Sequence, residues 1–255
     1  MRSTKAALVL SVACALAACG GSLQATPPAR GGPPTLTLGA TSARFEVHVS
    51  AGERSERARI TLDVREVERG ELLAWLQIVS VEPSVATPDA AGALGPLAGL
   101  AGVSFRWRMT RAGAIVAAGG PAAASNVPAE TVARALELWP LISAAVPNLP
   151  DGPVSEGQRW DARQRTEVIG GGRERVVLVA GKWHLAKILA GSPLTVVLEG
   201  DLVVVVRDPT LAADEIEAKA RSFSARAVVY VNLELHAVDF ATVASEAFSW
   251  QVRRL

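Results

Sequence analysis

An alternation of apolar and polar side chains runs through most of this chain and limits what it can fold into. Residues 43–50, 57–65 and 103–110 each follow a period of two; Phe45 and Val47, for example, flank a glutamate. Because successive side chains of a strand point to opposite faces, each segment predicts a strand with one apolar and one solvated face. Antiparallel sheets carry this pattern, since parallel sheets are usually covered on both sides.

Further segments with strand character continue to the end of the chain, and glycine-containing turns separate several of them. The predicted strands are residues 43–50, 57–65, 72–81, 103–110, 114–118, 160–169, 174–189, 194–207, 218–236 and 238–253. The last five are longer than the usual five to six residues of a strand. Long strands of this kind suit a strongly curved sheet or an open barrel.

One helix is predicted, in residues 128–146. Val132, Leu136 and Trp139 form an apolar stripe along it, and Pro140 removes a backbone donor, so we expect a kink or two short helices. Residues 83–102, rich in Pro, Ala and Gly, are predicted to be a long flexible connection with lid character and room for one helical turn. The expected fold class is α+β and mostly β: a curved antiparallel sheet, an open half-barrel, wrapped around one kinked helix.

Large apolar side chains on these elements are expected to converge on one interior. The chain has six Trp but only five Phe and one Tyr, and the tryptophans fall on separate predicted elements. Such an interior is either a close-packed core or a ligand cavity. The candidate cavity residues are Ile60, Phe105, Trp107, Val132, Leu136 and Trp139.

The first residues of the chain have the layout of a secretory signal peptide. A basic start is followed by an apolar run of about 13 residues, too short to span a bilayer, and then by Leu16-Ala17-Ala18-Cys19. The predicted organisation is a signal peptide in residues 1–18, a flexible Pro/Gly tether in residues 19–34 and a single β-rich domain in residues 35–255.

The Leu-Ala-Ala-Cys sequence resembles the bacterial lipobox. In that family the cysteine is acylated and becomes the mature N-terminus, which implies lipidation of Cys19. Gly20 in the next position resembles lipoproteins that Gram-negative cells sort to the outer membrane. The resemblance implies a protein anchored in the bacterial cell envelope, at the outer membrane facing the periplasm if the cell is Gram-negative.

A second motif, in residues 148–160, reads Leu-Pro, three residues, Val, two residues, Gly, two residues, Trp. It resembles a segment of a family of uncharacterised exported bacterial lipoproteins, in which it follows a helix and opens the second half of the sheet. The whole layout resembles the half-barrels of Lol-type carriers and related lipid-binding lipoproteins. Beneath the chain reversal we expect Val154 and Trp160 to be buried.

Composition and motifs exclude several function classes. Without residues 1–18 the chain carries 24 basic and 25 acidic residues and no basic run, which argues against a nucleic-acid partner. Cys19 is then the only cysteine, and His48, His184 and His236 fall on different predicted strands, so no metal site or cofactor is predicted. Catalytic and phosphate-binding motifs are absent from the sequence, so we expect no enzyme.

The function that the sequence favours is therefore that of a non-enzymatic envelope lipoprotein, held at the membrane through Cys19, that binds a hydrophobic or lipid-like ligand. The alternative is a structural or scaffolding lipoprotein whose interior is filled by its own side chains and which binds protein partners. The sequence names neither the ligand nor a protein partner.

Replacing the acylated residue tests the anchor. Cys19→Ser should abolish acylation and move the protein from the membrane fraction to the aqueous fraction. The rest of the mature sequence has no apolar run that could span a bilayer and no basic amphipathic face that could bind one. Metabolic labelling with palmitate should mark the wild-type protein only. Full membrane partitioning of the Cys19→Ser variant would contradict this prediction.

Overall fold

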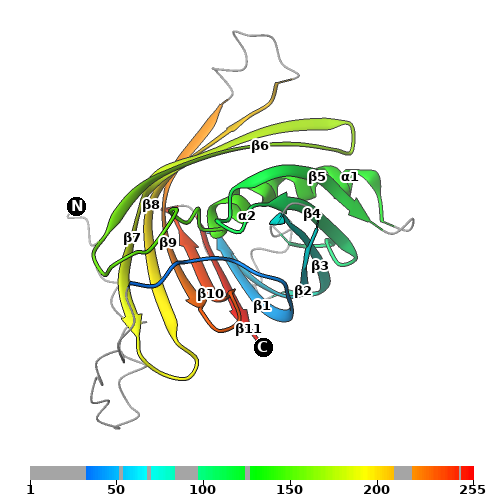
Figure 1. Ribbon diagram of the computed structural model, residues 1–255. Coiled ribbons are helices and arrows are strands. Elements are labelled where there is room, and N and C mark those ends of the chain that lie inside the picture. The colour runs from blue at the N-terminus through cyan, green and yellow to red at the C-terminus, as the bar shows by residue number, and fades with distance from the viewer. Residues whose placement is uncertain are drawn as a thin grey trace, which may run out of the picture. The chain divides into compact units, whose positions relative to one another are not determined.

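All the strands that the structure describes belong to one antiparallel sheet. The computed structural model describes residues 33–51, 54–67, 70–83, 97–123, 127–209, 220–246 and 248–255 (Figure 1). The strands are β1 (Thr41–Ala51), β2 (Arg54–Glu66), β3 (Leu72–Pro83), β4 (Val103–Met109), β5 (Ile115–Ala123), β6 (Arg159–Gly170), β7 (Arg173–Leu189), β8 (Thr195–Arg207), β9 (Arg221–Asn232), β10 (Ala237–Ala244) and β11 (Phe248–Arg254).

The strand order is β5-β4-β3-β2-β1-β11-β10-β9-β8-β7-β6. Two meanders, β1 to β5 and β6 to β11, each pair consecutive strands. The pairing of β1 with β11, from Phe45 opposite Arg254 to Ala51 opposite Phe248, joins the two meanders. Figure 1 shows the resulting sheet curling around the helices.

The period of two in the sequence corresponds to the two faces of this sheet. In β4, Val103, Phe105, Trp107 and Met109 are buried on the inner face, while the residues between them are partly or fully exposed. The predicted fold class, α+β and mostly β with a curved antiparallel sheet, is confirmed.

The predicted helix is divided into short pieces that lie inside the curve of the sheet (Figure 1). They are α1 (Ala129–Ala135), the 3₁₀ turn Leu136–Leu138 and α2 (Trp139–Ala145). Pro140 stands in the first turn of α2, where its missing N–H costs no intrahelical hydrogen bond. Of the two forms expected, the kink and the two short helices, the structure has the second.

Two of the predicted strands are interrupted in the structure and are therefore shorter than predicted. Residues 238–253 are not one strand, because the Ser245 N–H donates to the carbonyl of Phe248 and a turn separates β10 from β11. Residues 218–236 are also interrupted: β9 ends at Asn232, whose side-chain oxygen accepts the N–H groups of Glu234 and Leu235. Asn side chains commonly start turns in this way.

The predicted flexible connection is wrong for its described part. Leu97 and Leu100 are almost completely buried, and the Leu97 N–H donates to a carboxylate oxygen of Glu56 (2.6 Å). A buried carboxylate thus fixes the turn that the composition predicted to be mobile. Residues 84–96 lie outside the described part of the chain.

The motif in residues 148–160 forms a chain reversal between α2 and β6, as expected. Gly157 has a φ of 79°, a conformation that favours glycine. Val154 is fully buried, whereas Trp160 is only partly buried and donates its indole N–H to the carbonyl of Asn148 (2.7 Å).

The two outer strands of the sheet, β5 and β6, approach each other closely and almost close a barrel. A Cβ atom added to Gly120 of β5 would lie 1.5 Å from the carbonyl oxygen of Ile169 in β6. At Gly171, beyond the end of β6, an added Cβ would lie 2.8 Å from the Cβ of Ala133 in α1. Glycine is required at Gly120 because the two backbones touch there.

Adjacent glycines of β5 provide a test of this contact. Gly120→Ala should lower the free energy of unfolding by about 1–3 kcal/mol, because the added methyl group has to push β5 and β6 apart. Gly119→Ala is the matched control, since its added Cβ meets its nearest neighbour, the carbonyl oxygen of Arg106, at 3.4 Å. Denaturant unfolding measures both; equal losses would contradict the close approach.

Candidate functional site

The barrel encloses an apolar cavity of about 110 Å³ under the junction of β1 and β11. Its walls come from β1–β4, β10, β11, α2 and the segments next to them. The lining residues are Leu38, Gly39, Thr41, Phe45, Ile60, Leu62, Leu76, Trp107, Met109, Ile142, Ala145, Val146, Pro147, His236, Ala237, Val238, Ala241, Trp250 and Val252.

The chemistry of these walls suits a hydrocarbon group. The lining contains no Asp, Glu, Lys or Arg, and its polar side chains are the Thr41 hydroxyl and the His236 imidazole. The indole nitrogens of Trp107 and Trp250 are buried and have no hydrogen-bond partner within the described part of the chain. Cavities with apolar walls take up apolar ligands.

Partly exposed lining residues mark where the cavity reaches the surface. His236 is exposed, and Thr41, Leu62, Val238 and Val252 are partly exposed. These residues lie at the start of β1, near the end of β2, at the start of β10 and near the end of β11. We call this end of the barrel the mouth end.

Residues 33–40, which we call the strap, cross the mouth end. The Val154 N–H donates to the carbonyl of Pro34 (2.9 Å), and the Leu38 N–H donates to the carbonyl of Arg111 (2.7 Å). On the far side the Gly39 N–H donates to the carbonyl of His236 (2.8 Å). The strap thus connects the segment before β6, the β4–β5 turn and the β9–β10 turn.

His236 holds the strap at the rim of the cavity. It has a φ of 49°, and its Nδ1 lies 3.1 Å from the hydroxyl oxygen of Thr37. A Cβ added to Gly39 would lie 3.0 Å from the Cβ of His236, so a larger residue would crowd the imidazole. The histidine therefore has a positioning role in the rim, at the one exposed place in the cavity wall.

The six predicted cavity residues are divided between the cavity and the core around it. Ile60 and Trp107 line the cavity, and Phe105 lines a smaller void of about 10 Å³ deeper in the barrel. Leu136 and Trp139 are fully buried and line neither space, and Val132 is partly exposed.

Ring contacts bring three of these residues together. The Trp139 ring lies edge-on to Phe105 (5.8 Å between ring centroids) and to Trp107 (5.9 Å). Edge-to-face pairs of this geometry are favourable beyond the area that they bury. The helix side of the interior is thus a packed aromatic cluster, and the cavity lies beside it.

Sequence reasoning missed the contribution of the mouth end. Leu38 of the strap, Val146 after α2 and Val238, Ala241 and Trp250 of the last two strands all line the cavity. Val238 and Ala241 both line the cavity because the register of β10 shifts between Val238 and Phe240, which simple alternation does not indicate. Nothing local indicated that β11 pairs with β1.

A second hollow lies between the sheet edges β5 and β6. It has a volume of about 320 Å³ and is lined by residues 115–118 and 165–167. The Ile115 N–H donates to the side-chain oxygen of Gln164 across the gap (3.4 Å), where a neighbouring strand would normally supply a backbone carbonyl. The Thr166 hydroxyl is buried without a partner in the described part of the chain. We call this hollow the seam.

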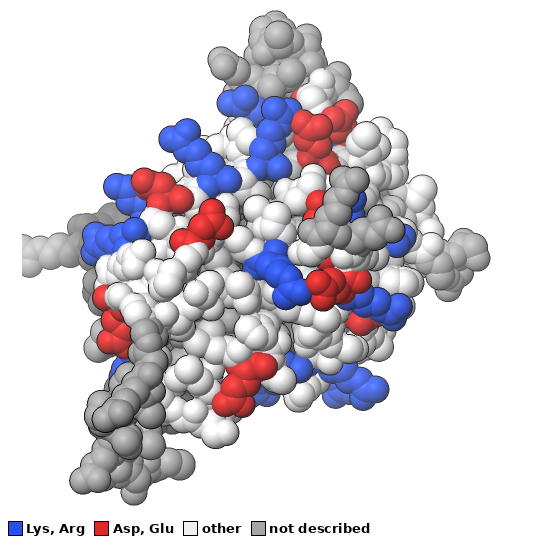
Figure 2. Space-filling view, viewed as in Figure 1, with Lys and Arg blue, Asp and Glu red and all other residues white. Residues whose placement is uncertain are grey.

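Charged groups lie on the outer face of the barrel and at its ends. Figure 2 shows both signs interspersed on one face, without a patch of a single sign. In β1, a hydrogen bond from His48 (2.8 Å) lowers the pKa of the Glu46 carboxyl; burial opposes this, and the charges of Arg57 and Arg253 add to it.

A buried ionic network ties the helical region to the strands. Arg175, only 8% exposed, donates to Glu137 (3.2 Å) and to Asp208 (2.5 Å). Arg221 of β9 pairs with the same Glu137 (3.4 Å). The network lies at the end of the barrel opposite the mouth, because Arg175 is near the start of β7. It has a structural role and does not reach the cavity.

The described residues give no candidate for two other kinds of site. Among them, no helix is both long and apolar enough to cross a bilayer. The same residues contain no group of three or more His, Cys, Asp or Glu side chains placed to hold a metal ion.

No protein-family model, no curated protein and no solved structure matches this chain. A functional proposal therefore depends on the residues of the cavity, the strap and the seam.

Two tryptophans of opposite exposure test the aromatic cluster beside the cavity. Trp139→Ala should lower the free energy of unfolding by about 3–5 kcal/mol, because Trp139 is fully buried against Phe105 and Trp107. Trp75→Ala, at a position 53% exposed, should change it by less than about 0.5 kcal/mol. Denaturant unfolding followed by circular dichroism measures both, and a small loss for Trp139→Ala would contradict the packing.

Proposed function

We propose that this protein is a membrane-anchored lipoprotein of the bacterial envelope that binds a hydrophobic or lipid-like ligand in the cavity under the β1–β11 junction. The observation that carries the proposal is the chemistry of the cavity: an apolar wall with His236 and Thr41 at the rim. A folded interior of this size normally contains few voids larger than a water molecule, so an open apolar space of about 110 Å³ needs a reason.

The size of the cavity limits the ligand. An engineered apolar cavity of about 150 Å³ holds a benzene molecule. A cavity of about 110 Å³ is smaller than that, so it accommodates the terminal part of a single acyl chain and not a complete lipid. The remainder of a longer ligand would lie across the mouth end, beside Thr41 and His236, which offer hydrogen bonds to a neutral polar group.

The anchor is the lipobox-like cysteine. Acylation of Cys19 supplies the two or more chains that stable membrane binding needs. The position of Gly20 supports the outer membrane, facing the periplasm, if the cell is Gram-negative. The role proposed is that of a binding protein and not of an enzyme, with no cofactor or nucleic acid involved.

The seam favours a second candidate function. Facing strand edges without a shared hydrogen-bond ladder can accept another chain, and β5 and β6 are the two edges of this sheet. On this alternative the protein is a scaffold that binds protein partners at the seam, and the small cavity is a packing defect. The packed cluster around Trp139 fits this alternative too.

Filling the cavity distinguishes the two functions. Cys19→Ser protein purified from the aqueous fraction should carry extractable lipid, seen by mass spectrometry, and should bind a fluorescent fatty acid with saturation. Ala241→Leu, on the inner face of β10, should lower the affinity about tenfold or more, because the added carbons occupy the space of the ligand.

Ala244→Leu is the matched control, because the same change falls on an exposed residue of the same strand and should leave binding unchanged. If the Cys19→Ser protein without a further change carries no lipid and binds no fatty acid, the ligand-binding function is wrong and the scaffold function replaces it.

A further inference from the structure

The mouth end carries large apolar side chains on its outer surface. Leu235, in the β9–β10 turn, is 48% exposed, and Leu255, at the C-terminus, is 62% exposed. Both are held beside the cavity rim. Leu235 precedes His236, and the Leu255 N–H donates to the carbonyl of Arg44 in β1 (2.9 Å). Exposed leucines from two separate chain positions thus lie at the same end of the barrel.

The chain that leads to the proposed anchor also leaves the barrel at this end. The strap begins at Pro33 and is fixed to the barrel through Pro34 and Gly39. Cys19 precedes Pro33 by fourteen residues, which reach at most about 50 Å when fully extended.

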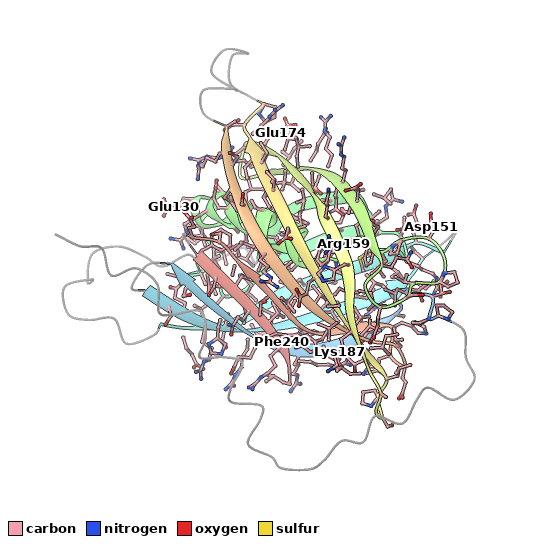
Figure 3. All side chains as sticks on the ribbon, turned by 90° about the vertical axis from the view of Figure 1, so that its left-hand side faces the viewer. Glu130, Asp151, Arg159, Glu174, Lys187 and Phe240 are labelled. Atoms are coloured by element: carbon pink, nitrogen blue, oxygen red, sulfur yellow. The ribbon has the colours of Figure 1, made fainter. Side chains whose placement is uncertain are left out.

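The opposite end of the barrel is far from the strap. The seventeen residues of β7 alone extend over roughly 56 Å. Figure 3 shows Lys187 and Phe240 toward one end of the long strands and Glu174 toward the other. The connection from the strap to Cys19 is shorter, even when fully extended, than β7 is long. A bilayer that holds Cys19 therefore lies nearer to the mouth end than to the end with Glu174.

We infer that the mouth end docks onto the bilayer that holds the acyl chains of Cys19, with Leu235 and Leu255 inserted at the lipid interface and the cavity open toward the lipid. The inference rests on the proposed anchor and adds the orientation and the source of the ligand, which is a lipid of that bilayer. A tethered surface needs little affinity of its own, because a short connection keeps it at a high effective concentration at the membrane.

The charges at this end are compatible with docking. Arg111 pairs with Glu66 (2.7 Å), and Arg254 pairs with Asp239 (3.1 Å). Each of these two ion pairs is neutral as a unit, so neither pair repels a neutral or an anionic bilayer. Long arginine side chains can also extend their charged ends to the headgroups while a neighbouring leucine enters the apolar layer.

A fluorescent label on one introduced cysteine tests the orientation. The acylated protein with Leu235→Cys, labelled with NBD and reconstituted in phosphatidylcholine vesicles, should show a blue-shifted emission that doxyl-labelled lipid quenches. Val203→Cys is the matched control, since Val203 in β8 has the same exposure of 48% but lies away from the mouth end. Its label should keep the emission that it has in water.

The outcomes separate the inference from the function on which it rests. Vesicle flotation reports the anchor: protein that does not float overturns the anchor, and the docking with it. Protein that floats but shows the same emission at both labelled positions overturns the docking alone.

A second measurement uses transfer of a fluorescent fatty acid from vesicles. The double variant Leu235→Asp, Leu255→Asp should slow transfer from phosphatidylcholine vesicles about tenfold or more, while Val203→Asp should not. The affinity for the same fatty acid added from water should stay unchanged in both variants, because neither leucine lines the cavity. Unchanged transfer by the double variant would overturn the docking.

Discussion

The pairing of β1 with β11 is the contact on which the rest of this structure depends. It joins residues that are about two hundred positions apart in the sequence, from Phe45 with Arg254 to Ala51 with Phe248. Every other neighbour in the described sheet is also a neighbour in the chain. Without this ladder the two meanders would be independent sheets, each with an uncovered apolar face. Such a long-range pairing is costly to form, because it closes a large loop.

The cavity follows from that pairing. Phe45 of β1 and Trp250 and Val252 of β11 form its wall on the two sides of the junction. The short helices fill the other side of the barrel, where Trp139 packs against β4. Two short helices cannot fill the whole interior of an eleven-stranded sheet, and the part that they leave unfilled lies under the junction and next to the mouth end.

The sheet edges and the strap then define the surfaces that a partner can reach. At Gly120 the two edges touch, whereas at Ile115 a glutamine side chain takes the place of a neighbouring strand. At the mouth end the strap, His236 and two exposed leucines lie together although they come from separate parts of the chain. The seam offers the edges of two strands beside Arg165 and Glu167, whereas the mouth end offers exposed leucines beside an apolar cavity, so the two surfaces suit different partners.

The sequence by itself determined the fold class, the apolar faces of the strands in residues 43–50, 57–65 and 103–110, and the break of the helix in the turn before Pro140. Each of these follows from a local rule: the period of two in a strand, or the missing N–H of a proline. Local rules also explain the errors. Residues 238–253 contain no glycine or proline that would mark the turn at Ser245, and the composition around Leu97 does not show that the carboxylate of Glu56 holds its N–H.

Only the tertiary structure decided where the cavity lies and what surrounds its mouth. Of the six residues expected to line it, Ile60 and Trp107 do so, while Leu136 and Trp139 belong to the packed cluster. Periodicity tells which face of a strand is apolar, but it does not tell which strand lies opposite. The space between opposing faces depends on the β1–β11 ladder and on the length of the helices inside the sheet, and these are properties of the assembled chain.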